Sequence, residues 1–378
     1  MMKYDVVVVG AGINGVYTAL ELLDRGVEKI AIIEKNYPGS GGTFRCATGI
    51  RASFTSREHV VLMKRSIEKW KELSGRFSFP FVQGGYVWLL SREEHLQSFM
   101  EYVRFHHSLG VPTRIVEPDE IRELVPSIKT DSLIAGVHDP IAGKSNPFTA
   151  LLNVLEYLRK NGVEARYPER VEKILVEEGR VKGVLTEKGV IEADNVLVAA
   201  GYGSREILRS CGVDAPINNL PKHALITEKY KEVFKPLLVD WETASYMVQT
   251  VSGGFLIGAE LEEEYNKPPI NRMEFLYTAV KIWSKYFEWF PSTHIIRYWT
   301  GYYVMTPDHH PVLGPVKGIE GLYVSTGFSG HGFMIAPAAS EAVAEWIVKG
   351  RPSIREAENL TLERFKEGKL IHEIAVFG

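Results

Sequence analysis

The segment YDVVVVGAGINGVYTALELLDRGVEKIAIIEK, Tyr4–Lys35, decides the fold of this chain. It carries the pattern G-x-G-x-x-G at Gly10, Gly12 and Gly15, between a short apolar run and a helical pattern. A second apolar run follows and ends at Glu34. This order of strand, turn, helix, strand and acid is the context in which the glycine pattern binds a dinucleotide.

Each of the three glycines has its own task in such a unit. Gly10 permits the tight turn, Gly12 lets the backbone approach a pyrophosphate, and Gly15 lets the helix pack closely on the strand. The start of the helix favours the anion through its free N–H groups and its dipole. Glu34 lies 24 positions after Gly10, where its carboxylate can accept a hydrogen bond from a ribose hydroxyl. The pattern alone fits NAD and FAD equally.

The next stretch, KNYPGSGGTFRCATGIRASF at Lys35–Phe54, favours FAD. An NAD-binding unit usually passes directly into its next strand and helix, whereas here the small-residue loop Gly39–Gly42 follows, with Thr43 and Arg45 behind it. Such a loop can follow a longer and fully buried cofactor. An ordinary surface loop is also rich in glycine and serine, so this stretch alone leaves that alternative open.

The composition points to the chemistry of small molecules. The net charge of -3 gives no basic excess for a phosphate backbone, so no nucleic-acid partner is expected. Cys46 and Cys211, the two cysteines, lie far apart and lack nearby histidines, so neither a disulfide nor a metal site is expected. We expect no signal peptide, no membrane span and a cytoplasmic location. The three glutamines favour a thermophilic source weakly.

Nucleotide-type signals recur in two later stretches. Val171–Gly201 is rich in strand-forming residues, with a turn predicted at Arg180 and Val181 and a buried strand from Asn195 to Ala200. Near the C-terminus, Gly321–Thr326 reads as a strand and Ala336–Gly350 as a helix. The helix is predicted with Pro337 in its first turn and Gly350 past its end, which leaves Gly327–Gly332 as a strand-to-helix loop.

These signals predict a discontinuous domain. The fold class expected is α/β (α+β), with a Rossmann-like FAD-binding domain and an inserted substrate domain built on a mainly antiparallel sheet. The FAD-binding domain is expected to comprise residues 1–80, 144–215 and 296–378. The substrate-binding domain is expected to comprise residues 81–143 and 216–295.

Several motifs together carry a family resemblance. GSGGTFRC at Gly39–Cys46, NVLVAAG at Asn195–Gly201, GYYVMTPDHHPVLG at Gly301–Gly314 and FSGHGFM at Phe328–Met334 accompany the first glycine pattern. With them, the chain resembles the FAD-dependent amine and amino-acid oxidoreductases of the D-amino-acid oxidase superfamily. Within it, the chain is most similar to the sarcosine oxidase branch, and above all to the β subunits of archaeal dye-linked L-proline dehydrogenases.

The resemblance implies a set of residues along a non-covalently bound FAD. Glu34 would meet the adenosine ribose, Val171 the adenine by its backbone, and Thr48–Ile50 one face of the isoalloxazine. The implied cofactor-binding residues are Gly10, Gly12, Ile13, Asn14, Gly15, Glu34, Lys35, Gly41, Gly42, Thr43, Arg45, Thr48, Gly49, Ile50, Val171, Ala200, Gly201, Gly301, Gly330, His331, Gly332, Phe333 and Met334.

The segment Gly330–Met334 also has a physical reason to face a flavin. It precedes a predicted helix, so free N–H groups and the positive end of the dipole can face the flavin's N1–C2=O edge. Negative charge accumulates at that edge when flavin accepts a hydride. The segment would therefore stabilise reduced flavin; a glycine-rich helix entry with no ligand is the alternative.

Four departures from the family pattern refine the expectation. Gly301 stands where monomeric sarcosine oxidases carry a flavin-tethering cysteine, so the FAD should be dissociable. Leu256 stands at the place of an oxygen-activating lysine, and Met334 at that of a lysine in the substrate pocket, so a dehydrogenase is expected.

Asn146 stands where some heterotetrameric members attach FMN to a histidine; any FMN at a subunit interface should then be non-covalent. Lys144 is a candidate phosphate contact, with an exposed loop lysine as the favoured alternative.

The expected reaction is oxidation of the C–N bond of a small secondary or primary amino acid, with L-proline first. Hydride would pass from the α-carbon to N5 of FAD, and electrons would leave through a second, α-type subunit of a hetero-oligomer or through a dye. Arg51 is the first choice for the substrate carboxylate because guanidinium binds carboxylates in a two-pronged way. The catalytic candidates are Arg51, His223, Tyr246, Tyr302 and His331.

Three rival functions stay open at this stage. One is an oxidase that uses O₂ on sarcosine, glycine or a related amine. Another is a flavin-carrying subunit without turnover of its own. An NAD enzyme is the least favoured.

Overall fold

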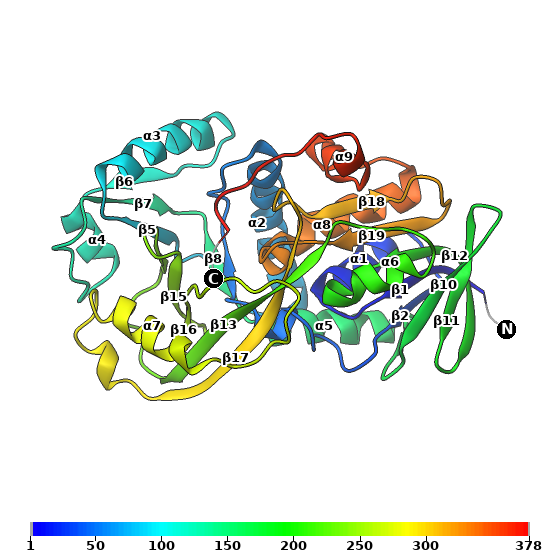
Figure 1. The fold of residues 1–378 in the computed structure, drawn as a ribbon, viewed down its shortest axis with the longest axis horizontal. Helices are drawn as coiled ribbons and strands as arrows, with labels where there is room; N and C mark the ends of the chain where they lie inside the picture. The colour runs from blue at the N-terminus through cyan, green and yellow to red at the C-terminus, as the bar shows by residue number, and fades with distance from the viewer. Residues whose placement is uncertain (1–2, 377–378) are drawn as a thin grey trace.

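Strand β1, Tyr4–Val9, lies inside the first of two large sheets because its side chains are apolar and almost wholly buried. It pairs in parallel with β12, Gly189–Val198, on one side and with β2, Ile30–Ile33, on the other. Strands covered on both faces read as continuous apolar runs, and VVVV in β1 is such a run. The computed structural model describes residues 3–376, and Figure 1 shows this sheet to the right.

The first sheet has eight strands in the order β10-β11-β12-β1-β2-β9, with β19 and β18 joined to it through β12. The bounds of the others are β9 Glu164–Arg166, β10 Val171–Glu177, β11 Arg180–Thr186, β18 Val312–Pro315 and β19 Leu322–Thr326. The turn predicted at Arg180 and Val181 is wrong by two residues. Glu178 and Gly179, both with positive φ, make the turn, and Arg180 already begins β11.

The second sheet, to the left in Figure 1, is antiparallel except for one pair. Its order is β17-β13-β16-β15-β14-β5-β7-β6, and only β14 and β5 run in parallel. The bounds are β5 Tyr86–Leu90, β6 Arg114–Val116, β7 Ala135–Asp139, β13 Asn218–Lys229, β14 Leu237–Asp240, β15 Ser245–Gln249, β16 Gly254–Gly258 and β17 Ile295–Met305. A small third sheet joins β3 Gly49–Ile50, β8 Gly143–Ser145 and β4 Phe81–Val82.

Helices cover the first sheet and fill the space between the sheets. Helix α8, Gly332–Lys349, packs against α1, Ile13–Asp24, and α2, Arg57–Phe77, near the middle of Figure 1. Its alanines are fully buried, and their small side chains let the helices approach closely. The remaining helices are α3 Glu93–Ser108, α4 Pro118–Leu124, α5 Pro147–Lys160, α6 Ser204–Arg209, α7 Met273–Trp283 and α9 Glu363–Lys366.

Helix α8 begins four residues earlier than predicted. It starts at Gly332, so Pro337 lies inside the helix and not in its first turn. Phe333 to Ile335 therefore belong to the helix, where Phe333 and Ile335 are buried. Apolar packing of this glycine-rich start outweighs its low helix propensity.

The predicted mixed α/β fold class is confirmed by these sheets. The domain boundaries stay a prediction, but one strand crosses them: β17, Ile295–Met305, pairs with β13 in the second sheet although residues 296–378 were assigned to the FAD-binding domain. Within residues 3–376, no helix is both long and apolar enough to cross a bilayer.

A buried ion pair fixes the C-terminal part of the chain to the loop before β18. Arg364 of α9 donates from Nε and Nη2 to the two carboxylate oxygens of Asp308, at 2.7 and 2.9 Å. Arg364 also donates to the carbonyls of Leu360 and His310. Both charged side chains are almost fully buried, at 3% and 0% exposure, so each depends on the other for its charge balance.

Arg364→Ala should therefore lower the free energy of unfolding by about 3–5 kcal/mol, because it leaves the Asp308 carboxylate buried without its partner. Chemical denaturation followed by circular dichroism measures this change. Lys366→Ala is the control, since Lys366 makes a single exposed ion pair in the same helix and should change stability by less than about 1 kcal/mol. Equal losses of stability from the two substitutions would contradict the role given to the buried pair of Arg364 and Asp308.

Candidate cofactor and substrate site

A large cavity lies between the two large sheets. It contains about 1260 Å³ of empty space, its open mouth included. One part of its wall comes from the carboxyl end of β1 and the loop at residues 40–47. The opposite part comes from β13, β15 and β17 of the second sheet. The cavity can therefore hold a long ligand that reaches from one sheet to the other.

The glycine turn after β1 forms one end of the cavity. Gly10 has φ +110°, and a Cβ there would lie 2.9 Å from the carbonyl carbon of Ala199, too close for any side chain. A Cβ on Gly15 would collide with the Gly10 carbonyl, so Gly15 lets α1 pack on the turn. Gly12 lines the cavity, whereas Gly15 has a packing role behind it. The predicted tight turn at Gly10 and close packing at Gly15 are thus observed, while the approach of a pyrophosphate to Gly12 stays a prediction.

Two side chains from other parts of the chain form hydrogen bonds to the backbone of the glycine turn. Glu34 lines the cavity, and its carboxylate accepts hydrogen bonds from the N–H groups of Ala11 and Asn36 at 3.1 and 2.9 Å. The Thr43 hydroxyl accepts the N–H of Ile13 at 3.0 Å, at the start of α1. The carboxylate and the helix start are thereby fixed on the same side of the cavity.

Glycines give the cavity open space along the backbone. A Cβ at Gly41, Gly42 or Gly201 would meet no protein atom within 4 Å, and all three glycines line the cavity. Nearby, the Asn14 amide donates to the Gly332 carbonyl at 3.0 Å, while its buried Oδ1 has no partner within the described chain. An unpartnered acceptor beside open space is suited to a ligand that donates hydrogen bonds.

The start of α8 lies on the same cavity. Gly330, Gly332 and Phe333 line it, and His331 is the N-cap residue. The first N–H groups of a helix have no partner inside the helix, and they carry the positive end of its dipole. The cavity therefore has two helix N-termini on its wall, those of α1 and α8.

The wall supplied by the second sheet is aromatic and weakly polar. Three of the predicted catalytic residues, His223, Tyr246 and Tyr302, line the cavity. His223 faces the Ile270 carbonyl at 3.3 Å from Nε2, and Tyr302 donates to the Lys267 carbonyl at 3.0 Å. These residues come from three different strands, which the sheet brings together.

Burial sets the protonation of this wall. It lowers the pKa of His223, so the imidazole is neutral at neutral pH. It raises the pKa of Tyr246 well above the usual value, so the phenol keeps its proton. In the loop on the opposite side of the cavity, burial raises the pKa of the Cys46 thiol to about 12. The second-sheet wall thus offers a neutral imidazole and a neutral phenol, and the facing loop offers no thiolate nucleophile.

Arg51 does not line the cavity. Its guanidinium donates to the carbonyls of Ser53 and Ala375, at 2.5 and 2.6 Å, and lies over the Phe54 ring at 3.6 Å. Burial lowers the pKa of Arg51 to about 10. Among residues 3–376 no carboxylate forms an ion pair with it. Arg51 is thus a buried residue outside the lining, and its charge interacts with Tyr303, which does line the cavity.

Other predicted residues also lie outside the lining. The His331 side chain packs against Phe54 and His59, with ring centroids 4.7 and 5.1 Å apart, so only the backbone around it faces the cavity. The carbonyl of Met334 accepts hydrogen bonds from Ser66 and Trp70. The predicted residues outside the lining are Gly15, Thr48, Gly49, Ile50, Arg51, Val171, His331 and Met334. The lining includes Gly10, Gly12, Ile13, Asn14, Glu34, Lys35, Gly41, Gly42, Thr43, Arg45, Ala200, Gly201, Gly301, Gly330, Gly332 and Phe333.

The positions that depart from the family pattern have clear local roles. A Cβ at Gly301 would lie 3.1 Å from Cδ of Arg45, so the glycine leaves room for that side chain. Leu256 is buried in β16, and Asn146 caps α5 by accepting the N–H groups of Phe148 and Thr149. The favoured interpretation of Lys144 as an exposed loop residue is wrong. It lies in β8 at 4% exposure, because β3 and β4 cover the strand on either side.

The sequence analysis missed two lining residues with chemical character. Lys222 lines the cavity, forms an ion pair with Glu260, and has Nζ 5.9 Å from the centre of the Tyr303 ring. Tyr303, in β17, also lines the cavity and is partly buried. A lysine inside the otherwise apolar stretch LPKHALIT was the available signal for Lys222. Tyr303 carried no signal that set it apart from its neighbours Tyr302 and Tyr298.

Comparisons with known proteins agree with this geometry. A family model described as "FAD dependent oxidoreductase" matches residues 5–346. The chain is 27% identical to the sarcosine oxidase subunit beta of Rhodobacter capsulatus, over 100% of this chain and 92% of that protein. It is 25% identical to mitochondrial dimethylglycine dehydrogenase of Rattus norvegicus, over 93% of this chain and 43% of the relative.

Solved structures of amino-acid oxidoreductases share the fold of this chain. L-proline dehydrogenase from P. horikoshii superposes with a TM-score of 0.93 at 35% identity, over 97% of this chain and 99% of that one. Glycine oxidase from Bacillus cereus superposes with a TM-score of 0.84 at 19% identity, over 92% and 96%, which establishes a shared fold alone.

The close approach at Gly10 leads to a direct test. Gly10→Ala should weaken FAD binding at least tenfold, or about 1.4 kcal/mol, because the new Cβ forces the turn away from Ala199. The ratio of flavin to protein absorbance after gel filtration, with a dissociation constant from FAD titration, measures the change. Gly26→Ala is the matched control, since Gly26 has φ +85° but no atom within 4 Å of a Cβ. Unchanged FAD affinity in Gly10→Ala would refute the role of the turn.

Proposed function

The chain belongs to the FAD dependent oxidoreductase family, and on that premise we propose that it is a dehydrogenase that oxidises the C–N bond of a small amino acid. The family resemblance found in the sequence is thereby confirmed. L-Proline is the substrate we place first, because the structure that is 35% identical is an L-proline dehydrogenase. The cavity must then hold the flavin and the amino acid side by side, with a cation close enough to bind the carboxylate of the amino acid.

The cavity fits FAD from end to end. The Gly10–Gly12 turn and the start of α1 would hold the pyrophosphate, and the Glu34 carboxylate would hold the ribose. The open backbone at Gly41 and Gly42 leaves a path for the chain of the cofactor toward the second sheet. The isoalloxazine ring system of the flavin would then lie between the start of α8 and the aromatic wall. No cysteine stands at Gly301, which supports a dissociable cofactor.

When bound, FAD would accept hydride equivalents from the carbon next to the amine nitrogen. The first N–H groups of α8 would stabilise the negative charge that this reaction brings to the ring. Neutral His223 and Tyr246 would orient the amine without placing another charge beside it. The amine must enter as the free base, so turnover should rise with pH as more of the substrate loses its proton.

One observation carries the assignment of the substrate carboxylate: Arg51 is buried at 3% exposure and its hydrogen bonds go to carbonyls, while the Glu373 and Asp139 carboxylates act on its charge without a direct ion pair. Among residues 3–376, the directly bonded carboxylate that usually accompanies a buried guanidinium is missing. We propose that a substrate carboxylate supplies it, and that Arg51 leaves the Ala375 carbonyl to reach the cavity beside Tyr303. Lys222 is the other cation within reach of the same wall.

Electrons must then leave the flavin. Leu256 provides no cation where a lysine would favour reaction with oxygen, which supports a dehydrogenase over an oxidase. The relatives named as sarcosine oxidase subunit beta support a second subunit, which we propose as the acceptor. A non-covalent FMN at the interface is the carrier that we propose between them. Lys144, next to the cap residue Asn146, would be the FMN contact on this chain. Burial lowers its pKa to about 8.

The experiment that tests the proposal is anaerobic mixing of the FAD-loaded chain with a panel of amines. L-Proline should bleach the flavin absorbance, and an artificial dye should reoxidise it much faster than air does. H₂O₂ formed at the rate of amine turnover would instead establish an oxidase. If no amine bleaches the flavin, with or without the second subunit, the chain would instead be a subunit that carries flavin without turnover of its own.

Arg51→Lys should raise KM about tenfold or more and change kcat less, because one ammonium replaces a two-pronged guanidinium while the charge is kept. Steady-state kinetics with dye reduction separate the two constants. Arg297→Lys, in exposed β17, is the matched control and should leave both unchanged. A fall in kcat at constant KM would show that Arg51 does not bind the carboxylate.

A further inference from the structure

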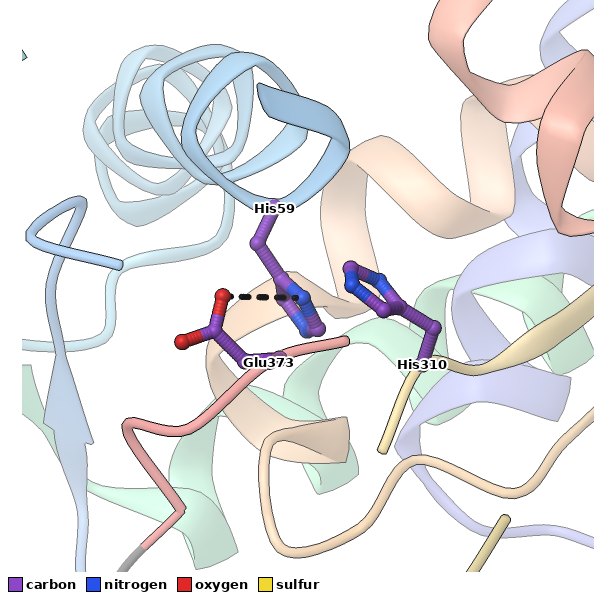
Figure 2. A group of neighbouring side chains, drawn as sticks. All are labelled: His59, His310 and Glu373. Carbon is purple, nitrogen blue, oxygen red and sulfur yellow. Dashed lines mark ion pairs between the residues drawn. The ribbon is translucent and has the colours of Figure 1, made fainter. Parts of the chain in front are cut away.

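Three buried side chains meet behind the cavity, at the N-terminal end of α2. Figure 2 shows His59 from the helix, His310 from the loop before β18, and Glu373 from the C-terminal segment, all directed toward one point. One nitrogen of each ring and one carboxylate oxygen lie within 4.8 Å of one another. The residues are 1%, 0% and 1% exposed.

The imidazoles lack the hydrogen bonds that buried polar groups normally have. Within the described chain, neither ring nitrogen of His310 has a partner, and Nε2 of His59 has none. Nδ1 of His59 lies 3.4 Å from the Ser56 hydroxyl and 3.7 Å from Oε2 of Glu373. An unsatisfied buried nitrogen costs about 1–3 kcal/mol, so several in one cluster indicate a missing ligand.

Both imidazoles of the cluster are uncharged, so each keeps a lone pair that a metal ion can use. Burial, together with the neighbouring cationic groups, holds the pKa of both His59 and His310 well below the usual range. Their lone pairs are therefore free. The two nearest carboxylates are Glu373 and Asp308; Asp308 is neutralised by Arg364, which leaves the Glu373 charge for the cluster.

We propose that His59, His310 and Glu373 bind a divalent transition-metal ion, with zinc the one expected. Two imidazoles and one carboxylate are a familiar donor set for Zn²⁺, and neutral imidazole suits zinc better than Mg²⁺ or Ca²⁺. No sequence spacing revealed the site, because its ligands come from three segments far apart in the chain.

The rings have to move only a little to bind. Zinc–nitrogen distances of about 2.0–2.1 Å place tetrahedral ligand atoms about 3.3 Å apart, so the separations must shrink by up to about 1.5 Å. His59 and Glu373 are close to that already, at 3.7 Å. Oε2 of Glu373 also accepts the Ser56 hydroxyl at 2.7 Å, and this bond is the one that the metal would replace. The Ser56 hydroxyl can then turn away, because its position is free to rotate.

A metal here would fasten the C-terminal segment. Glu373 already accepts N–H and hydroxyl groups of Thr55 and Ser56 at the start of α2. The backbone of Glu373 is already bonded to the loop that carries His310, since its N–H donates to the Asp308 carbonyl at 3.2 Å, and the ion would add a link between side chains. Two residues on, the Ala375 carbonyl holds Arg51, so the ion would stabilise the resting position of that side chain. The site itself is independent of the proposed reaction.

The test uses the full-length chain with FAD bound. After treatment with EDTA and desalting, titration with ZnCl₂ should give one ion per chain by elemental analysis and a rise in melting temperature. His310→Gln and Glu373→Gln should each weaken zinc binding about tenfold or more, since loss of even an outer partner of a metal ligand costs about 10–100-fold. His372→Ala, exposed on the same segment, should bind zinc like the unchanged chain.

A crystal of the zinc-treated protein measured at the zinc absorption edge locates the ion whether or not the variants fold. An anomalous peak between the three side chains supports the proposal. Absence of a peak there overturns it, as does zinc binding that His372→Ala abolishes. A melting temperature and metal content unaffected by zinc overturn it as well, and ordered water would then account for the free nitrogens.

Discussion

The close contact between the turn at Gly10 and the strand end at Ala199 is the constraint on which the rest of the structure depends. Only a residue without a Cβ allows β1 to end against that carbonyl, and only Gly15 allows α1 to start directly above the turn. The helix N-terminus, the Glu34 carboxylate and the Thr43 hydroxyl are positioned relative to that turn. If the turn moved outward, the wall of the cavity would move with it.

The cavity also depends on the second sheet, which closes it from the opposite side. β13, β15 and β17 are built from residues 218–305, yet His223, Tyr246 and Tyr302 face the glycine turn across the open space. The first sheet thus provides the glycine turn and a helix N-terminus, and the second provides a wall whose groups stay neutral because they are buried. Oxidation of an amine beside a flavin needs both, with free N–H groups for the charge that accumulates on the ring.

The strand, glycine turn and helix at the N-terminus could be predicted from the sequence because their requirements are local. Three glycines, an apolar strand and an acid at a set distance can be read from about thirty residues. It placed the turn at Arg180 two residues late and began α8 too late, because tertiary packing extends that helix over glycines of low propensity. Lys222 and Tyr303 could not be singled out, since which strand faces the cavity depends on sheet pairing between distant segments. Lys144 was taken for a loop residue for the same reason.

The C-terminal segment shows how far such long-range contacts reach. Arg364, Glu373 and Ala375 attach it to the loop at Asp308, to the start of α2 and to Arg51. The side chain expected to meet the substrate is therefore held by residues more than 300 positions away, which no local pattern could reveal.

The account's central claim is that one cavity holds FAD from the glycine turn to the second sheet. A crystal structure of the chain with FAD tests this most directly. The pyrophosphate should lie against Gly10–Gly12 with the ribose on Glu34, and the ring system should lie between the start of α8 and the wall of His223 and Tyr246. A ring system found outside that wall, or a ribose without contact to Glu34, would contradict the claim.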